Sequence, residues 1–174
     1  MLTGFAWPLP NGAPGDWVEE VELCRSGVHA CRPGDLSNWL APVLYEIELD
    51  GDVAEAGMKV VAPRGRLVRR IGAWNDETHE EYSQMCIARA GARAASAPEL
   101  VGPWAPPAAA SAAGPALMGY IAARMAEAID GIDAHAAERV RQSAWLVERL
   151  KLASPTARAT GSRLRSKSSP VATV

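Results

Sequence analysis

The sequence predicts an α+β fold: a small, mostly antiparallel sheet with a short inserted helix, followed by three longer helices and a flexible tail. Apolar and polar residues alternate over much of residues 1–74, which is typical of half-buried strands. From residue 75 onward, apolar residues recur at the three- and four-residue spacing of helices. Five prolines between residues 98 and 115 interrupt this helical part, because proline lacks the amide donor that a helix interior needs.

The composition narrows the class of protein. The chain has 174 residues, 48% of them hydrophobic, which suffices for one domain with a buried core. A formal net charge of −2 gives no electrostatic reason to expect nucleic acid as a partner, and no apolar run is long enough to predict a membrane span. The odd count of three cysteines and the lack of an export signal in residues 1–10 predict reduced thiols in a cytoplasmic protein.

Strands are expected first along the chain. Residues 17–24 alternate in polarity, and residues 27–31 predict a second short strand that Pro33-Gly34 ends. Asp35 then caps a short helix through Leu40, because its carboxylate can accept the free amide hydrogens of the first turn.

The clearest strand covers residues 43–49. One of its faces is apolar and consists of Val43, Tyr45, Ile47 and Leu49, whereas Glu46 and Glu48 lie on the other face. A turn at 50–52 follows. Residues 58–71 then predict a further strand or hairpin, bent at Pro63-Arg64-Gly65.

Three longer helices are predicted. The first covers residues 75–97, with a capping box formed by Thr78 and Glu81. Its buried face is expected to contain Tyr82, Met85, Cys86 and Ala90. The other two helices, at 116–129 and 133–152, form a hairpin connected by Gly131. One stripe of the first hairpin helix holds Leu117, Ile121, Met125 and Ala128; one edge of the second holds Val140, Ala144, Val147 and Lys151.

These elements predict four regions. Residues 1–97 form an α+β domain, and residues 98–115 form a linker rich in proline and alanine. The helical hairpin occupies residues 116–152, and a flexible tail with few large apolar groups occupies residues 153–174.

The densest group of chemically versatile residues lies between Cys24 and Cys31. The thiolates of Cys24 and Cys31 and the imidazole of His29 could bind zinc, with His79 or Cys86 as a fourth ligand. Alternatively, His29 acts as the base for a nucleophilic Cys31 or Cys24. A third interpretation makes the cysteines small buried hydrophobic residues and places His29 in or beside the core. Arg25, inside this segment, is a candidate ligand-binding residue.

Charged and aromatic residues supply the other candidates. Glu46 and Glu48 on one strand face could act as acid and base, or could form the solvent face of an edge strand. Arg66 and Arg70 are expected on one face, where they could bind a phosphate or carboxylate. The alternative is that the arginines pair with the two glutamates across the sheet. Trp39 fills the core or lines an aromatic pocket.

Several motifs resemble those of a known group of proteins. Gly27-Val28-His29-Ala30-Cys31, then Asp35-Leu36 and Trp39-Leu40, then a strand with Glu-x-Glu-Leu, resemble an uncharacterised bacterial and phage family with a Gly-[Phe/Val]-His-x-Cys core. This resemblance implies no particular activity. The same segment is distantly similar to the ADP-ribosyltransferase fold, a likeness that would place His29 at the tyrosine position and Trp39 at the helix aromatic.

The sequence therefore predicts a binding or interaction module, with a homo-oligomer or a protein partner bound through the 116–152 hairpin. No cofactor is expected. The alternatives are a small transferase-like enzyme centred on His29, with Cys31, Glu46 and Glu48 as further catalytic candidates, and a structural zinc site at Cys24, His29 and Cys31.

Overall fold

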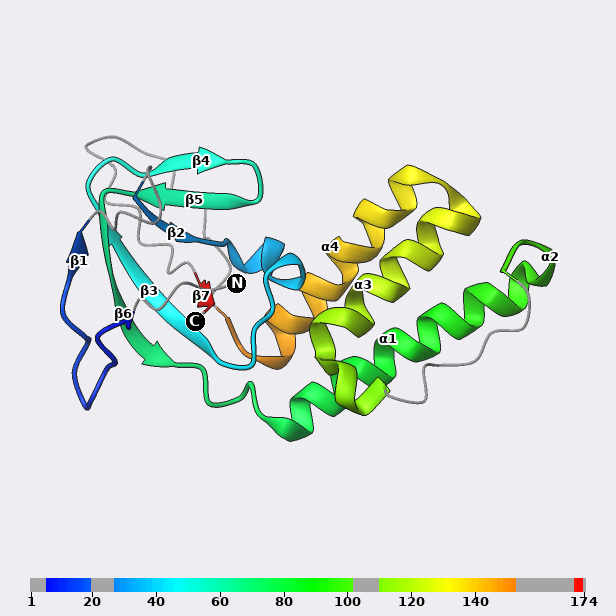
Figure 1. Cartoon of the computed structure of the whole chain (residues 1–174), viewed down its shortest axis with the longest axis horizontal. Helices are drawn as coiled ribbons and strands as arrows, with labels where there is room; N and C mark the ends of the chain where they lie inside the picture. Colours follow the sequence, from blue (N-terminus) through cyan, green and yellow to red (C-terminus); the bar gives the residue numbers. More distant parts are fainter. Residues whose placement is uncertain (1–5, 20–26, 102–109, 153–170, 174) are drawn as a thin grey trace. The chain divides into compact units, whose positions relative to one another are not determined.

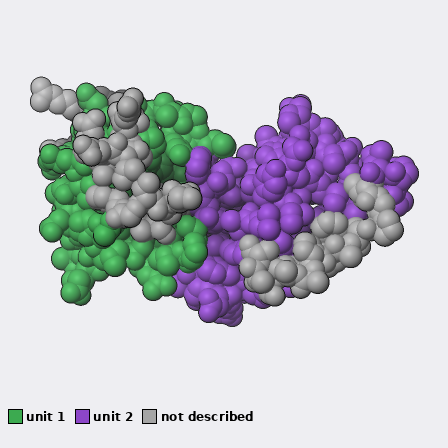
Figure 2. Space-filling model, viewed as in Figure 1, with its two compact units in different colours: residues 1–33, 41–71, 151–174 green, residues 34–40, 72–150 purple. Residues whose placement is uncertain are grey.

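The computed structural model describes residues 6–19, 27–101, 110–152 and 171–173, and they adopt the predicted α+β fold (Figure 1). The chain divides into two compact units (Figure 2). The first comprises residues 1–33, 41–71 and 151–174, and the second comprises residues 34–40 and 72–150. The first long helix, which the sequence analysis grouped with the sheet, thus lies in the second unit with the other long helices.

The first unit contains two antiparallel sheets. The four-stranded sheet has the order β1-β6-β3-β7, with β1 at Val18–Glu19, β6 at Arg64–Arg70, β3 at Leu44–Asp50 and β7 at Val171–Thr173. The three-stranded sheet has the order β2-β5-β4, with β2 at Val28–Ala30, β5 at Lys59–Ala62 and β4 at Ala54–Ala56. The sequence analysis did not anticipate β4, whose three residues are all exposed.

One apolar core joins the two sheets. Its buried residues are Val28, Ala30, Tyr45, Ile47, Val60 and Leu67, with Val43 and Leu49 packed against them. The predicted apolar face of residues 43–49 is therefore confirmed. The bend predicted in residues 58–71 is present as well, but β5 and β6 belong to different sheets and do not pair as a hairpin. Pro63 separates them at a position where its missing amide interrupts no ladder.

A β-bulge changes which arginines share a face. Glu46 lies opposite Arg69 and Ile47 opposite Leu67, so Val68 is an extra residue in β6. An extra residue reverses the alternation of side chains on the bulged strand. The prediction that Arg66 and Arg70 share a face is therefore wrong, because the bulge places Arg66 and Arg69 on the same face.

The second unit is helical. The short helix is a 3-10 helix, η1 at Pro33–Asn38, so Asp35 lies inside it, and the prediction of Asp35 as its N-cap and of an end at Leu40 is wrong. It precedes α1 at Asp76–Ser96, α2 at Pro98–Val101, α3 at Ala110–Asp130 and α4 at Ile132–Arg149. Helix α3 packs against both α1 and α4. Gly131, with φ of 92°, makes the tight connection between α3 and α4 that the sequence predicts, because glycine adopts positive φ without steric cost. Among the described residues, no helix is both long and apolar enough to cross a membrane.

The helix ends differ from the predictions in two further places. The N-cap of α1 is Asn75, whose side chain accepts a hydrogen bond from the Thr78 amide at 3.1 Å. Glu81 does not complete a capping box and instead pairs with Arg149. In the segment predicted as a linker, residues 98–101 form α2, and α3 begins at Ala110 but is kinked at Gly114 before Pro115. Residues 102–109 lie outside the described part.

The end of the predicted tail returns to the first unit. Residues 153–170 and Val174 lie outside the described residues. Residues 171–173 form β7, which pairs antiparallel with β3 in the register Leu44 to Thr173. The chain thus contributes to the first unit both before and after the helices.

Candidate interaction surface

The candidate residues around His29 come from both sheets of the first unit. His29 is half-buried on β2 opposite Val61, whereas its neighbours Val28 and Ala30 face the core. Burial, with the positive charge of Lys59, lowers the pKa of His29 below its usual value. Glu46 and Glu48 belong to β3, which is in the other sheet. The transferase hypothesis, in which His29 and these carboxylates act together, stays a prediction.

The predicted zinc ligands are only partly described. Cys24 and the neighbouring Arg25 lie outside the described residues, and Cys31 is buried. No three His, Cys, Asp or Glu side chains in the described part of the chain are grouped as metal ligands. Cys86, a candidate fourth ligand, is fully buried, and burial raises the pKa of its thiol to about 12. Its thiolate would therefore be scarce at neutral pH.

The charged ladder on β3 and β6 forms internal ion pairs. Arg66 donates to Glu48 at 2.8 Å, and Arg69 makes two hydrogen bonds with Glu46. The guanidinium of Arg66 also lies 4.6 Å from the centroid of the Trp17 ring. The alternative that the arginines pair across the sheet is thus what the structure shows for these two. Arg70 is exposed opposite Tyr45, and Trp39 is half-buried in the second unit.

The hairpin helix α3 leaves several of its large apolar residues exposed or partly exposed. Its inward residues are Met118, Gly119, Ala122, Ala123 and Ala126, all buried and mostly small. The stripe noted in the sequence lies on the opposite side, with Leu117 44% exposed. We call this outer surface the α3 stripe and define it as Leu117, Tyr120, Ile121, Arg124, Met125 and Ala128.

The α3 stripe is shallowly hollowed. Its residues from Tyr120 to Ala128 line an open depression of about 420 Å³. Tyr120 is 48% exposed and lies 6.0 Å from the guanidinium of Arg139. Arg124 is held by Glu127 in an ion pair of 2.6 Å, so its charge is compensated within the helix. The result is an open, largely apolar surface whose charge is neutralised locally.

Helix α4 buries polar as well as apolar residues. Its buried face carries the polar residues Glu138, Gln142 and Ser143, which are all less than 2% exposed. Val140, on the edge noted in the sequence, is 64% exposed. Helices of monomeric proteins usually place their larger apolar residues inward and their polar residues outward. Helix α4 departs from this rule at these four positions, although its Leu146 is buried as well.

A hydrogen-bonded network satisfies the buried polar residues of α4. Glu138 accepts hydrogen bonds from the Arg89 Nε and Nη2 at 2.7 and 2.8 Å. Gln142 accepts from the Tyr82 hydroxyl at 3.1 Å and donates to the Gly119 carbonyl at 3.0 Å. The sequence analysis missed this network; its one available signal was Arg89 and Arg93 four residues apart on the inward half of α1.

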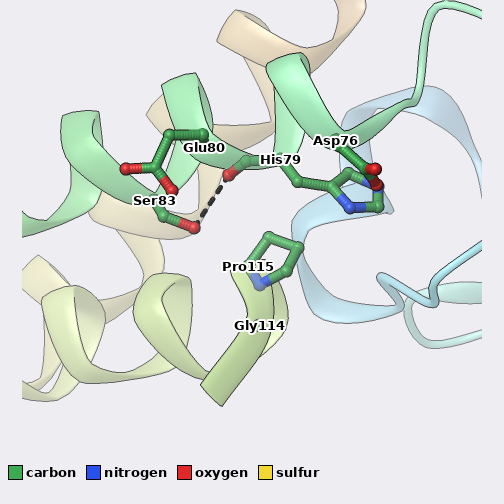
Figure 3. A pocket seen from close by; sticks show the side chains of 6 residues that line it. All are labelled: Asp76, His79, Glu80, Ser83, Gly114 and Pro115. Atoms are coloured by element: carbon green, nitrogen blue, oxygen red, sulfur yellow. Dashed lines mark hydrogen bonds between the residues drawn. The ribbon is translucent and has the colours of Figure 1, made fainter. Parts of the chain in front are cut away.

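A second pocket lies beside the start of α1. It encloses about 290 Å³ and is lined by Asp76, His79, Glu80, Ser83, Gly114 and Pro115 (Figure 3). The His79 ring packs 4.2 Å from that of Trp74, and burial lowers the pKa of His79 although Asp76 opposes this effect. Ser83 donates its hydroxyl hydrogen to the His79 carbonyl at 2.8 Å (Figure 3). This hydroxyl is thus directed to the backbone carbonyl of His79 and not to its imidazole.

In the comparisons with known proteins, no family model, no curated protein and no solved structure matches this chain significantly.

Proposed function

We propose that this protein is an interaction module whose helical unit binds a protein partner through the α3 stripe. The observation that carries the proposal is the orientation of α3: apart from Met118 its buried residues are small, whereas Leu117 and Tyr120 are exposed. Between positions 110 and 123 the helix has no charged residue. A helix that is apolar all round is typically covered on every side.

The energetics favour covering this surface. Transferring apolar area out of water contributes about 25 cal/mol per Å², or roughly 1.5–3 kcal/mol for a fully buried large side chain. Leu117 and Tyr120 are each nearly half exposed, and Ile121 and Met125 are partly exposed beside them. These side chains gain little in the isolated chain and would gain most of this free energy under a partner. A tyrosine at the centre of such a patch is also a frequent anchor of protein interfaces.

Site-specific photo-crosslinking tests the proposal. The photoreactive residue p-benzoylphenylalanine replaces Tyr120 in the full chain expressed in its native host, and Met58 in a matched control. Met58 is 48% exposed on the β4–β5 turn of the other unit. We expect a discrete adduct from position 120, and no such adduct from position 58.

A second substitution on the stripe shows whether the adduct depends on this surface. Met125→Glu places a charge in the depression and should abolish the adduct formed from position 120, whereas Met58→Glu should leave it unchanged. Mass spectrometry identifies the partner. Failure to form any adduct, or an adduct that survives Met125→Glu, would contradict the proposal.

A further inference from the structure

We infer that the partner of the α3 stripe is a short, largely apolar segment of another protein that presents one carboxylate to Arg139. The inference rests on the proposed function and adds the chemistry of the partner. It is carried by the position of Arg139, which lies on α4 beside the stripe and has no acidic partner among the described residues.

The ion pairs of the helical unit leave Arg139 out. In the described part of this unit, every other arginine lies within ion-pair distance of an aspartate or glutamate: Arg89, Arg93, Arg124, Arg141 and Arg149. Glu138 precedes Arg139 in the chain, but its carboxylate is shared by three of these arginines. The positive charge of Arg139 is therefore not balanced by an ion pair with any described residue.

Neutral groups hold the guanidinium of Arg139 in place. Its Nη1 donates to the Ser37 carbonyl at 3.0 Å and to the Gln142 Oε1 at 3.2 Å. Its Nε is buried and has no hydrogen-bond acceptor in the described part of the chain. A side chain that is already ordered loses little further conformational entropy when it binds a partner. Nη2 donates to no described residue, so it is the nitrogen on which we place the partner's carboxylate.

This guanidinium lies beside the apolar surface. It is 6.0 Å from the centroid of the Tyr120 ring, and Tyr120, a member of the α3 stripe, is 48% exposed. A partner that covers Tyr120 therefore also restricts the access of water to Arg139. Desolvation of an unpaired charge is costly, whereas a carboxylate that forms a charge-assisted hydrogen bond replaces the lost water. The position of Arg139 thus selects an acidic residue over an apolar or basic one at this end of the stripe.

The remaining charges decide how acidic the partner is. Arg124 is paired with Glu127 at 2.6 Å, so the stripe itself needs no second carboxylate. Residues 34–40 and 72–150 contain six arginines, no lysine and eleven carboxylates, a formal net charge of −5. This excess of negative charge repels a polyanion such as nucleic acid or an anionic membrane. A protein segment with one acidic residue among apolar ones fits the surface better.

The size of the stripe favours a short segment over a folded domain. Positions 117 to 128 span about 16 Å of helix at 1.5 Å per residue. The stripe contributes far fewer than the roughly 20–30 residues per side of a standard stable interface. A short amphipathic helix that lays its apolar face on a groove matches this length. We expect its acidic residue at the end of the stripe near Tyr120 and its apolar residues over Met125 and Ala128.

Photo-crosslinking from position 117 tests the role of Arg139. The photoreactive residue p-benzoylphenylalanine replaces Leu117, which is 44% exposed, in the full chain expressed in its native host. Arg139→Gln should lower the adduct yield at least tenfold, whereas Arg139→Lys keeps the charge and should retain most of it. Arg141→Gln is the matched control, because Arg141 is exposed on the same helix and already paired, and it should leave the yield unchanged. Circular dichroism establishes that the variants are folded. An equal yield with Arg139→Gln would overturn the inference.

Charge exchange separates recognition from a structural role of Arg139. Tandem mass spectrometry of the adduct locates the crosslinked segment of the partner, which should contain an aspartate or glutamate among apolar residues. Arg139→Glu should abolish the adduct, and replacement of that acidic residue of the partner by arginine should restore it. A crosslinked segment without an acidic residue, or a failure of the exchange to restore the adduct, would contradict the inference.

The two proposals can fail separately. An adduct that requires Met125 but not Arg139 would refute the carboxylate and leave the interaction module standing. An adduct of twice the 18.4 kDa mass of the chain, whose partner peptides come from this same sequence, would refute another protein as the partner. The absence of adducts from both position 117 and position 120 would refute both proposals.

Discussion

At the scale of single residues, Glu138 has the most constrained chemistry in the helical unit. Its side chain is fully buried, yet it accepts two hydrogen bonds from Arg89 and lies 2.9 Å from the Arg93 Nη2. Burial by itself raises the pKa of Glu138, but the hydrogen bonds and charges of Arg89 and Arg93 outweigh it and lower the pKa to about 2. The carboxylate is therefore ionised at neutral pH and connects α1 to α4.

We expect Glu138→Gln to lower the free energy of unfolding at pH 7 by about 2–4 kcal/mol, because it leaves two guanidinium groups without their buried counter-charge. Urea denaturation measures this change. Glu148 is exposed on the same helix, so Glu148→Gln is the control. It should change the free energy of unfolding by less than about 0.5 kcal/mol.

The pH dependence of this effect has a defined direction. The folded pKa of Glu138 lies below its ordinary value of 4.5, so the stabilisation is complete above about pH 4.5 and is lost as the pH falls toward about 2. The difference in unfolding free energy between the wild type and Glu138→Gln should narrow over this interval. A difference that stayed constant from pH 7 to pH 3 would argue against the ion pair as its source.

At the scale of elements, the close contact between α1, α3 and α4 depends on Gly119. A Cβ atom added at this position would lie 2.5 Å from the Tyr82 hydroxyl and 3.0 Å from the Gln142 Oε1. Real Cβ atoms do not come within 2.5 Å of another atom, so a side chain here would force Tyr82 or the helices to shift. The small residues on the inward side of α3 thus determine how closely α1 and α4 can approach this helix.

Gly119→Ala should destabilise the protein by about 1–3 kcal/mol, because the added methyl overpacks the helix contact. Helix propensity predicts the opposite sign, a gain of up to about 1 kcal/mol for glycine to alanine in a helix interior. In a Tyr82→Phe background the closest clashing atom is gone, and the cost of Gly119→Ala should be smaller. Urea denaturation of the wild type, the two single variants and the double variant measures the coupling energy between positions 82 and 119. If Gly119→Ala stabilised the protein, the contact between the helices would have room for the added methyl group, and this explanation would be wrong.

At the scale of the whole molecule, the chain passes repeatedly between its two units. Residues 34–40 and 72–150 belong to the helical unit, and the last strand, β7, belongs to the sheet unit. Strand β7 covers one edge of β3 by pairing Tyr45 with Ala172 and Glu46 with Val171. Without β7, β3 would present an unpaired edge.

Deletion of residues 171–174 should therefore accelerate hydrogen exchange of the backbone amides in Leu44–Glu46 by about tenfold or more, while α3 and α4 keep their protection. Ala172→Pro keeps the length of the chain and should act in the same direction, since proline cannot pair within a ladder. Hydrogen exchange followed by mass spectrometry resolves these segments. Unchanged exchange in residues 44–46 would contradict the pairing of β7 with β3.

The sequence by itself determined the type and approximate limits of the main elements. Alternation identified β3 and its apolar face, because one face of a sheet must be buried. Helical spacing identified α1, α3 and α4, and Gly131 marked the turn between the last two. The stripe from Leu117 to Ala128 was also visible in the sequence, since residues three and four apart share a helix face.

Only the tertiary structure decided which side of α3 faces inward. Both sides of this helix are apolar, so periodicity cannot choose between them, and the close approach of Gly119 to Tyr82 and Gln142 selects the side with small residues. The pairing of β-strands was undetermined for a related reason: the bulge at Val68 depends on the partner strand. The α3 stripe is therefore a surface because the opposite side, with its small residues, lets α1 and α4 pack closely against α3.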